Sequence, residues 1–147
     1  MHRRHAGNGG TAVHAGAQVG NAEAVRLLLD SGANVNQWNH SGSTAYRTAL
    51  VNAIALDNVE ITTLLLDSNS YITRDNYRGF KTHKTPLMHA AYYGSIKVAT
   101  MLLDSRGVDP NETNESQRTA LMVATDGARG AEVAKLLLER GANRLGG

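Results

Sequence analysis

The sequence predicts an all-α fold, a solenoid in which helix-turn-helix units stack in a row. A triplet of leucine type recurs four times, with starts 37, 37 and 35 residues apart, at residues 27–29, 64–66, 101–103 and 136–138. A threonine stands sixteen or seventeen positions before each triplet, at Thr11, Thr48, Thr85 and Thr119. This spacing is typical of stacked repeat units and is too regular for an ordinary globular domain.

Composition narrows the class of protein. The 147 residues are 41% apolar, which is enough for one domain with a buried core, and the net charge is only +2. The absence of cysteine excludes a disulfide framework, a cysteine-type zinc site and a cysteine nucleophile. Residues 1–10 contain no apolar stretch of signal-peptide type, and no segment reaches transmembrane length. We therefore expect an intracellular protein, cytoplasmic or nuclear, with no membrane partner.

The third unit shows how each unit is built. Thr85 is a favourable N-cap, and Pro86 suits the first turn of a helix, where its missing N–H has no partner to lose. Gly94 stands where a chain leaving a helix often takes the left-handed conformation. A second helix then runs to about Asp104, with an apolar stripe that needs another element against it.

The first unit repeats these features in register and ends in the tail Gly-Ala-Asn-Val-Asn at residues 32–36. With the Thr-Pro-Leu run of the third unit, the glycine that ends the first helix and the leucine triplets, the chain resembles the ankyrin repeat family. The resemblance covers roughly Gly9 to Asn143. It divides a single domain, residues 1–147, into repeats at roughly 7–38, 39–75, 76–111 and 112–144.

The resemblance implies the architecture of each repeat. Two antiparallel helices would be followed by a β-hairpin finger, with small alanines on the first helix and the leucines of the second helix forming a continuous core. His14 matches the family histidine that bridges neighbouring units by hydrogen bonds. His89 lies one residue out of that register. No metal-ligand spacing or catalytic motif accompanies these histidines, so we expect no metal, no cofactor and no enzymatic activity.

Two units depart from the pattern. The second has Asp57 where the first and third have Gly20 and Gly94, and we expect Asn58 and Asn69 to take the left-handed turns, because asparagine tolerates that backbone best after glycine. We expect this unit to be the weakest locally. The fourth has an extra residue within 127–130, which predicts a looser turn between its helices. Neither end has a separate cap, so self-capping and a fragment of a longer array both remain open.

The predicted fingers carry the best functional signal. Residues 36–48 and 73–85 each span twelve positions, against eight for residues 111–119, so two adjacent fingers are enlarged. Loops on a rigid scaffold concentrate binding residues. Aromatic and basic side chains gather in these fingers and at the end of the first helix of the third unit. The candidate partner-binding residues are Trp38, Tyr46, Arg74, Tyr77, Arg78, Phe80, Lys81, Tyr92 and Tyr93.

We interpret the chain as a non-enzymatic, monomeric scaffold that binds a protein or peptide in the concave groove that the resemblance implies. Arg74, Arg78, Lys81 and Lys84 favour an acidic segment in that partner. One alternative is single-stranded nucleic acid, bound by stacking on Tyr77 and Phe80, although the small net charge argues against it. Another is a regulatory or substrate-recruiting piece of a larger enzyme.

Overall fold

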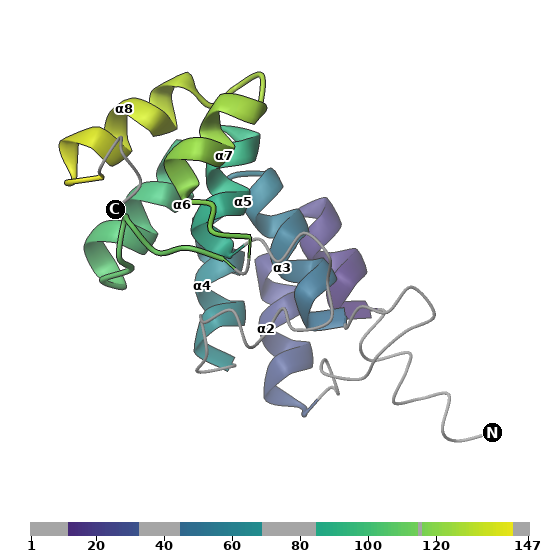
Figure 1. Ribbon diagram of the computed structural model, residues 1–147. Coiled ribbons are helices and arrows are strands. Elements are labelled where there is room, and N and C mark those ends of the chain that lie inside the picture. The colour runs from purple at the N-terminus through teal and green to yellow at the C-terminus, as the bar shows by residue number, and fades with distance from the viewer. Residues whose placement is uncertain (1–11, 33–44, 69–84, 115, 143–147) are drawn as a thin grey trace. The chain divides into compact units, whose positions relative to one another are not determined.

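The computed structural model describes residues 12–32, 45–68, 85–114 and 116–142, and these residues form helices joined by turns, without a strand (Figure 1). The chain divides into two compact units, Met1–Ile72 and Thr73–Gly147. Each unit is described by itself. The part of the chain that the structure describes contains no helix long and apolar enough to cross a membrane.

Unit 1 contains two helical pairs. Its helices are residues 12–19, α2 (Ala22–Asp30), α3 (Ala45–Ala55) and α4 (Val59–Ser68). Gly20 turns the chain between the first two helices at φ 80°, and Asn21 then caps α2 by accepting the N–H of Ala24 at 3.0 Å. This turn matches the prediction made for the glycine position of the repeat.

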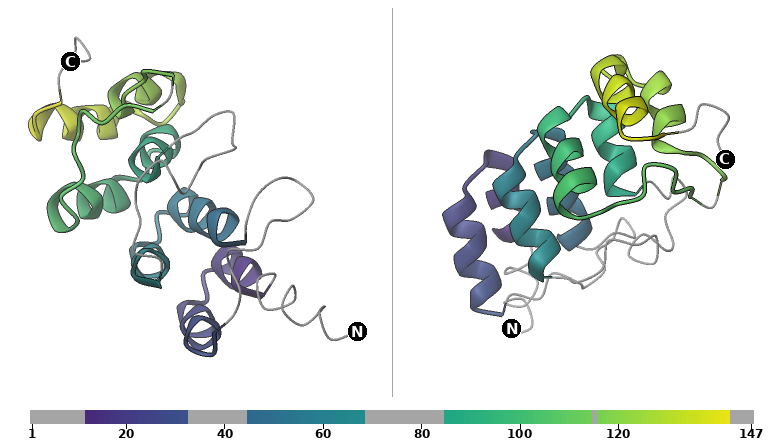
Figure 2. Two further views of the ribbon diagram at one scale, coloured as in Figure 1. Left: turned by 60° about the horizontal axis from the view of Figure 1, so that its bottom comes forward. Right: turned by 90° about the vertical axis from the view of Figure 1, so that its left-hand side faces the viewer.

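The core of unit 1 lies between these helices. Helix α4 packs against α3 and against α2, and both views in Figure 2 show α2 and α4 side by side. Val13, Val25, Ile61 and Leu65 have no solvent-accessible surface. The apolar positions that recur along the sequence thus meet in the interior, which explains the stacking of the two pairs.

Unit 2 repeats the arrangement. Its helices are α5 (Pro86–Tyr93), α6 (Ile96–Thr100) continued by the π-helical segment η2 (Met101–Ser105), α7 (Ala120–Asp126) and α8 (Ala131–Glu139). As predicted, Thr85 caps α5: its hydroxyl accepts the N–H of Met88 at 3.3 Å. Thr119 caps α7 in the same way, and α5 packs against α7 while α6 packs against α8.

The turn of the second repeat corrects the sequence-based expectation. Asp57, not Asn58, takes the left-handed backbone, with φ 56°. The side chain of Asn58 instead accepts the N–H of Ile61 at 2.9 Å and so caps α4. The prediction for Asn58 is therefore wrong, because its carbonyl oxygen is more useful as a helix cap. Asn69 lies outside the described residues.

The turn of the fourth repeat is longer than the others but it is not loose. Gly127 is extended, at φ −93° and ψ 143°, and Gly130 is the N-cap of α8. A Cβ atom added at Gly127 would collide with the carbonyl oxygen of Tyr92, and one added at Gly130 would collide with that of Ala124. The prediction of a looser turn is wrong, because two glycines let the longer loop pack closely on its neighbours.

Helix boundaries differ from the repeat pattern in two places. Helix α3 begins at Ala45, so Thr48 lies inside the helix and does not precede it as Thr85 precedes α5. The second helix of the third repeat ends at Ser105, near the predicted Asp104, but its last turn is wider than an α-helix. The N–H of Arg106 reaches the carbonyl of Met101 at 3.2 Å, a bond over five residues.

The leucine triplets form the core only in part. Leu65, Leu66, Leu102 and Leu137 are buried, as the resemblance implies. Leu27 of α2 is 62% exposed, however, and Leu138 of α8 is 44% exposed. The prediction of a continuous leucine core is therefore wrong for these two positions, which lie in the first and the fourth repeat.

The β-hairpin fingers are not confirmed. Two of the three predicted fingers fall mostly outside the described residues, and the connection after η2 carries no strand where the structure describes it. This connection nevertheless turns back on itself at Asn114. The backbone N–H of Asn114 donates to the carbonyl of Arg118 at 3.1 Å. The buried side chain of Asn114 accepts the N–H groups of Ser116 and Arg118, at 2.8 and 3.1 Å.

Candidate functional site

Only part of the predicted binding set can be placed. Tyr92 and Tyr93 are described in full, and the backbone of Tyr46 lies in α3. The remaining candidates lie outside the described residues: Trp38, Arg74, Tyr77, Arg78, Phe80 and Lys81. The structure therefore brings together two of the nine predicted residues, and the others stay predictions.

Tyr92 and Tyr93 form a perpendicular aromatic pair at the C-terminal end of α5. Their ring centroids are 5.1 Å apart with an interplanar angle of 88°, a favourable edge-to-face geometry. Tyr93 also stacks on His89, with centroids 6.4 Å apart and planes 15° apart. His89 is 6% exposed, whereas Tyr92 is 38% exposed. The pair thus has a buried aromatic base and one ring that solvent or a partner can reach.

The backbone beneath the tyrosines is held firmly. Gly94 ends α5 in the left-handed conformation, with φ 72°, and its N–H donates to the carbonyl of Ala90. A Cβ atom added at Gly94 would lie 2.5 Å from the carbonyl oxygen of Arg129. Together with the contact of Gly127 on Tyr92, this fixes the end of α5 against the turn between α7 and α8.

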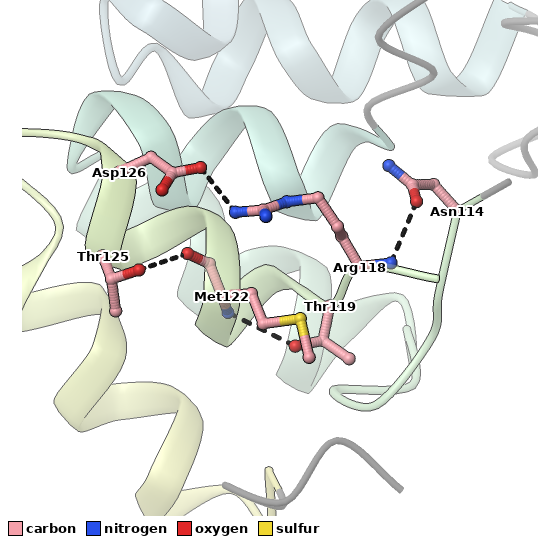
Figure 3. A network of polar contacts seen from close by, with 6 residues as sticks. All are labelled: Asn114, Arg118, Thr119, Met122, Thr125 and Asp126. Carbon is pink, nitrogen blue, oxygen red and sulfur yellow. Dashed lines mark hydrogen bonds and ion pairs between the residues drawn. The ribbon is translucent and has the colours of Figure 1, made fainter. Parts of the chain in front are cut away.

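A pocket that the sequence did not predict lies on α7 and α8. It has a volume of about 460 Å³ and is lined by Arg118, Thr119, Leu121, Met122, Thr125, Asp126 and Leu138. Figure 3 shows the polar contacts among its residues. Arg118 forms an ion pair with Asp126, and the hydroxyl of Thr125 donates to the carbonyl of Met122 at 2.6 Å. The lining thus combines apolar side chains with an ion pair and a hydroxyl group.

The sequence carries one signal for this pocket. Thr125 occupies the repeat position of Ala17 and Ala91, both of which are fully buried, and Thr125 itself is exposed. A polar residue at a position that is buried and apolar in the other three repeats indicates a different environment in the fourth repeat.

Unit 2 contains a second ion pair, between the third and fourth repeats. Arg140 of the turn after α8 donates from Nε and Nη2 to the two oxygens of Asp104, at 2.9 and 3.0 Å. The hydrogen bonds from Arg140 lower the pKa of Asp104, and the same bonds raise the pKa of Arg140. Asp109, in the connection after η2, accepts the N–H of Asn111 at 2.9 Å and so shapes its own turn.

Histidine geometry agrees with a structural role for His14. Nδ2 of Asn52 lies 3.1 Å from Nδ1 of His14, and this hydrogen bond joins the first repeat to the second, as the resemblance implies. Within the described residues no group of three or more His, Asp or Glu side chains is placed to hold a metal ion.

Comparison with known families gives one result. A family model described as Ankyrin repeats matches three overlapping stretches, residues 1–76, 39–114 and 74–144. Each stretch is about as long as two of the four predicted repeats, so the model counts three copies where the sequence pattern has four units. A search of the curated proteins found no match.

Proposed function

The chain belongs to the ankyrin repeat family, and from this premise we propose that it is a non-enzymatic module that binds a protein or peptide at the tyrosine end of α5. Ankyrin repeats are, in general, protein–protein interaction modules. The family membership supports binding of this broad kind. The location of the site and the nature of the partner are our proposal.

The observation that carries the proposal is the exposed face of the Tyr92–Tyr93 pair. Tyrosine is enriched among the residues that dominate binding energy, because it offers a large contact area and a polar tip. Here one ring is accessible while its neighbour is supported by buried His89. Since Gly94 and Gly127 fix the backbone, the rings project from a rigid base.

The finger residues extend the proposal. Tyr77, Arg78, Phe80 and Lys81 belong to the same unit as the tyrosine pair, and we propose that they contact the same partner. Their positive charge favours an acidic segment. Such complementarity mainly accelerates association, so the association rate should fall with added salt while the dissociation rate changes little.

The test compares the Tyr92→Ala/Tyr93→Ala double variant with the unchanged chain. Partners are captured on the intact chain and identified, and their Kd is then measured for both proteins. We expect the double variant to lose about 2 kcal/mol of binding free energy or more, roughly a 30-fold rise in Kd. Leu56→Ala serves as the control, because Leu56 is a 54% exposed apolar residue at the end of another helix.

Two results would contradict the proposal. An unchanged Kd in the double variant, with the control also unchanged, would remove the tyrosines from the site. Retention of single-stranded nucleic acid with an affinity that falls steeply with salt would instead favour phosphate contacts by the basic fingers.

A further inference from the structure

The residues Asp126 and Gly127 join α7 to the turn that leads into α8. An aspartate followed by a glycine is the pair of residues most prone to close a succinimide ring, because glycine has no Cβ atom to hinder attack by its backbone nitrogen. The sequence contains this pair once. Both residues belong to the described part of unit 2, so the structure shows how far the fold permits the reaction.

The carboxylate of Asp126 is accessible to solvent. Its side chain is 55% exposed. Gln18 and Tyr92 occupy the equivalent positions of the first and third repeats, and both are exposed although another repeat follows within the same unit. Exposure at this position is therefore compatible with a following repeat, and solvent reaches the carboxylate without any opening of the helices.

The backbone nitrogen of Gly127 is available as the attacking group. Gly127 leaves α7 in an extended conformation, and among the described residues its N–H donates no hydrogen bond of good geometry. The end of α2 differs in this respect. There Ser31 follows Asp30, and the N–H of Ser31 donates to the carbonyl of Leu27 at 3.0 Å. Such a bond holds the nitrogen in the helical turn, whereas the nitrogen of Gly127 is not held in this way.

Arg118 restrains the carboxylate. Nη2 of Arg118 donates to Oδ2 of Asp126, and Figure 3 shows the two side chains pointing toward one another. While this ion pair is formed, the carboxylate of Asp126 cannot turn freely toward the nitrogen of Gly127. Because both side chains are partly exposed, the ion pair is weak, and it slows the reaction without preventing it.

We infer that Asp126 is a modification site, at which the aspartate isomerises to isoaspartate and the ion pair with Arg118 limits the rate. The nitrogen of Gly127 attacks Cγ of Asp126 and forms a new C–N bond. One carboxyl oxygen leaves as water, taking the proton of the N–H group and a second proton from the carboxyl group or solvent. Water then opens the ring. Cleavage of the new bond regenerates aspartate, and cleavage of the original peptide bond gives isoaspartate.

Isoaspartate changes the turn between α7 and α8. The main chain then runs through Cβ and Cγ of residue 126, one atom longer than before, and the former backbone carbonyl becomes a free carboxylate. Gly127 has no room for this change, because even a Cβ atom added to it would collide with the carbonyl oxygen of Tyr92. The isoaspartyl form should therefore lose the packing of this turn on α5 and unfold at a lower temperature.

The test follows isoaspartate at residue 126 while the folded chain is stored at neutral pH. Enzymatic methylation of isoaspartate, read by peptide mapping, separates this site from Asn8 and Gly9, a pair that gives the same product by losing ammonia. We expect isoaspartate to accumulate at residue 126 faster than at Asp30. Arg118→Gln should raise the rate at residue 126 roughly twofold to fivefold, the range that corresponds to loss of an exposed ion pair.

Two further variants distinguish the ion pair from a general loosening of the turn. Arg118→Lys keeps the charge, so its rate should stay below that of Arg118→Gln. Arg129→Gln is the matched control, because Arg129 is an exposed arginine of the same turn for which the described residues show no ion pair. Its rate should equal that of the unchanged chain. Added salt should raise the rate of the unchanged chain but not that of Arg118→Gln, because salt screens an exposed ion pair.

Circular dichroism of every variant verifies that the helices are retained. The inference is overturned if no isoaspartate forms at residue 126, or if Asp30 reacts as fast as Asp126. It is also overturned if Arg118→Gln and Arg129→Gln react at the same rate, or if salt changes the rates of the unchanged chain and of Arg118→Gln equally.

Discussion

Asp104 and Arg140 are joined by two hydrogen bonds, at 2.9 and 3.0 Å, that link the π-helical end of the third repeat to the end of α8 in the fourth. Side-by-side contact of a carboxylate with two guanidinium N–H groups is the geometry in which an ion pair is most directional. Both side chains remain partly exposed, at 45% and 38%, so solvent screens the pair.

The Asp104–Arg140 ion pair makes the stability of the folded chain depend on pH in the acidic range. Arg140 lowers the pKa of Asp104 in the folded chain. The contribution of the ion pair to the free energy of unfolding is therefore fully present above the unfolded carboxyl pKa of about 3.9, and it is lost as pH falls through the lowered folded value. We expect Asp104→Asn to lower the Tm at neutral pH. The difference from the unchanged chain should shrink as pH falls below about 4 and disappear at still lower pH.

Thermal unfolding followed by circular dichroism across this pH range measures the effect. Glu132→Gln is the control, because the described residues offer this exposed carboxyl of α8 no ion pair. A difference for Asp104→Asn that stays constant with pH would show that the charge of Asp104 is not its source.

Gly94 is the glycine whose replacement should cost most. Gly94→Ala forces a Cβ into left-handed backbone, which costs about 1–2 kcal/mol, and also places it 2.5 Å from the carbonyl oxygen of Arg129. Gly107→Ala is the matched control, since Gly107 has φ 66° but open space around the added atom. Denaturant titration should show a clearly larger loss of unfolding free energy for Gly94→Ala than for Gly107→Ala. Equal losses would show that the turn containing Arg129 moves away from the added Cβ atom at little cost.

Replacing Asp57 by glycine should make the folded chain more stable. Its φ of 56° carries a strain that glycine avoids, so Asp57→Gly should raise the free energy of unfolding by about 1 kcal/mol. Asn58→Ala should lower it by about the same amount, through loss of the cap on α4. If instead Asn58→Gly stabilised the chain, the assignment of these two roles would have to be exchanged.

The side chain of Thr62 places a buried hydroxyl group at a repeat position that is apolar in other repeats. It has no accessible surface, and its oxygen finds no hydrogen-bond partner among the described residues. The equivalent residues Val25 and Ala99 are apolar. Thr62→Val keeps the shape and should raise the free energy of unfolding by about 1 kcal/mol. Thr63→Val, at a half-buried position, should change it much less; a loss of stability in Thr62→Val would reveal a partner for the hydroxyl.

Sequence alone predicted the elements that depend on local rules. Thr85, Pro86 and Gly94 bracket one helix by capping, ring geometry and backbone freedom, and the structure agrees at each position. Asp57 and Asn58 were assigned in the wrong order, because either residue can turn left-handed and only the cap on Ile61 distinguishes them. The pocket was not predicted. It is lined by side chains of α7 together with Arg118 and Leu138, and the repeat pattern of the sequence does not show which side chains leave such a space between them.

The packing of Gly127 against the carbonyl of Tyr92 has a consequence for recognition. Because this end of α5 is already fixed before any partner arrives, binding there would sacrifice little backbone entropy, and most of the free energy of contact would remain available as affinity. The proposed binding surface is thus preorganised, so a longer side chain at position 127 should weaken binding by displacing the end of α5, without contacting the partner itself.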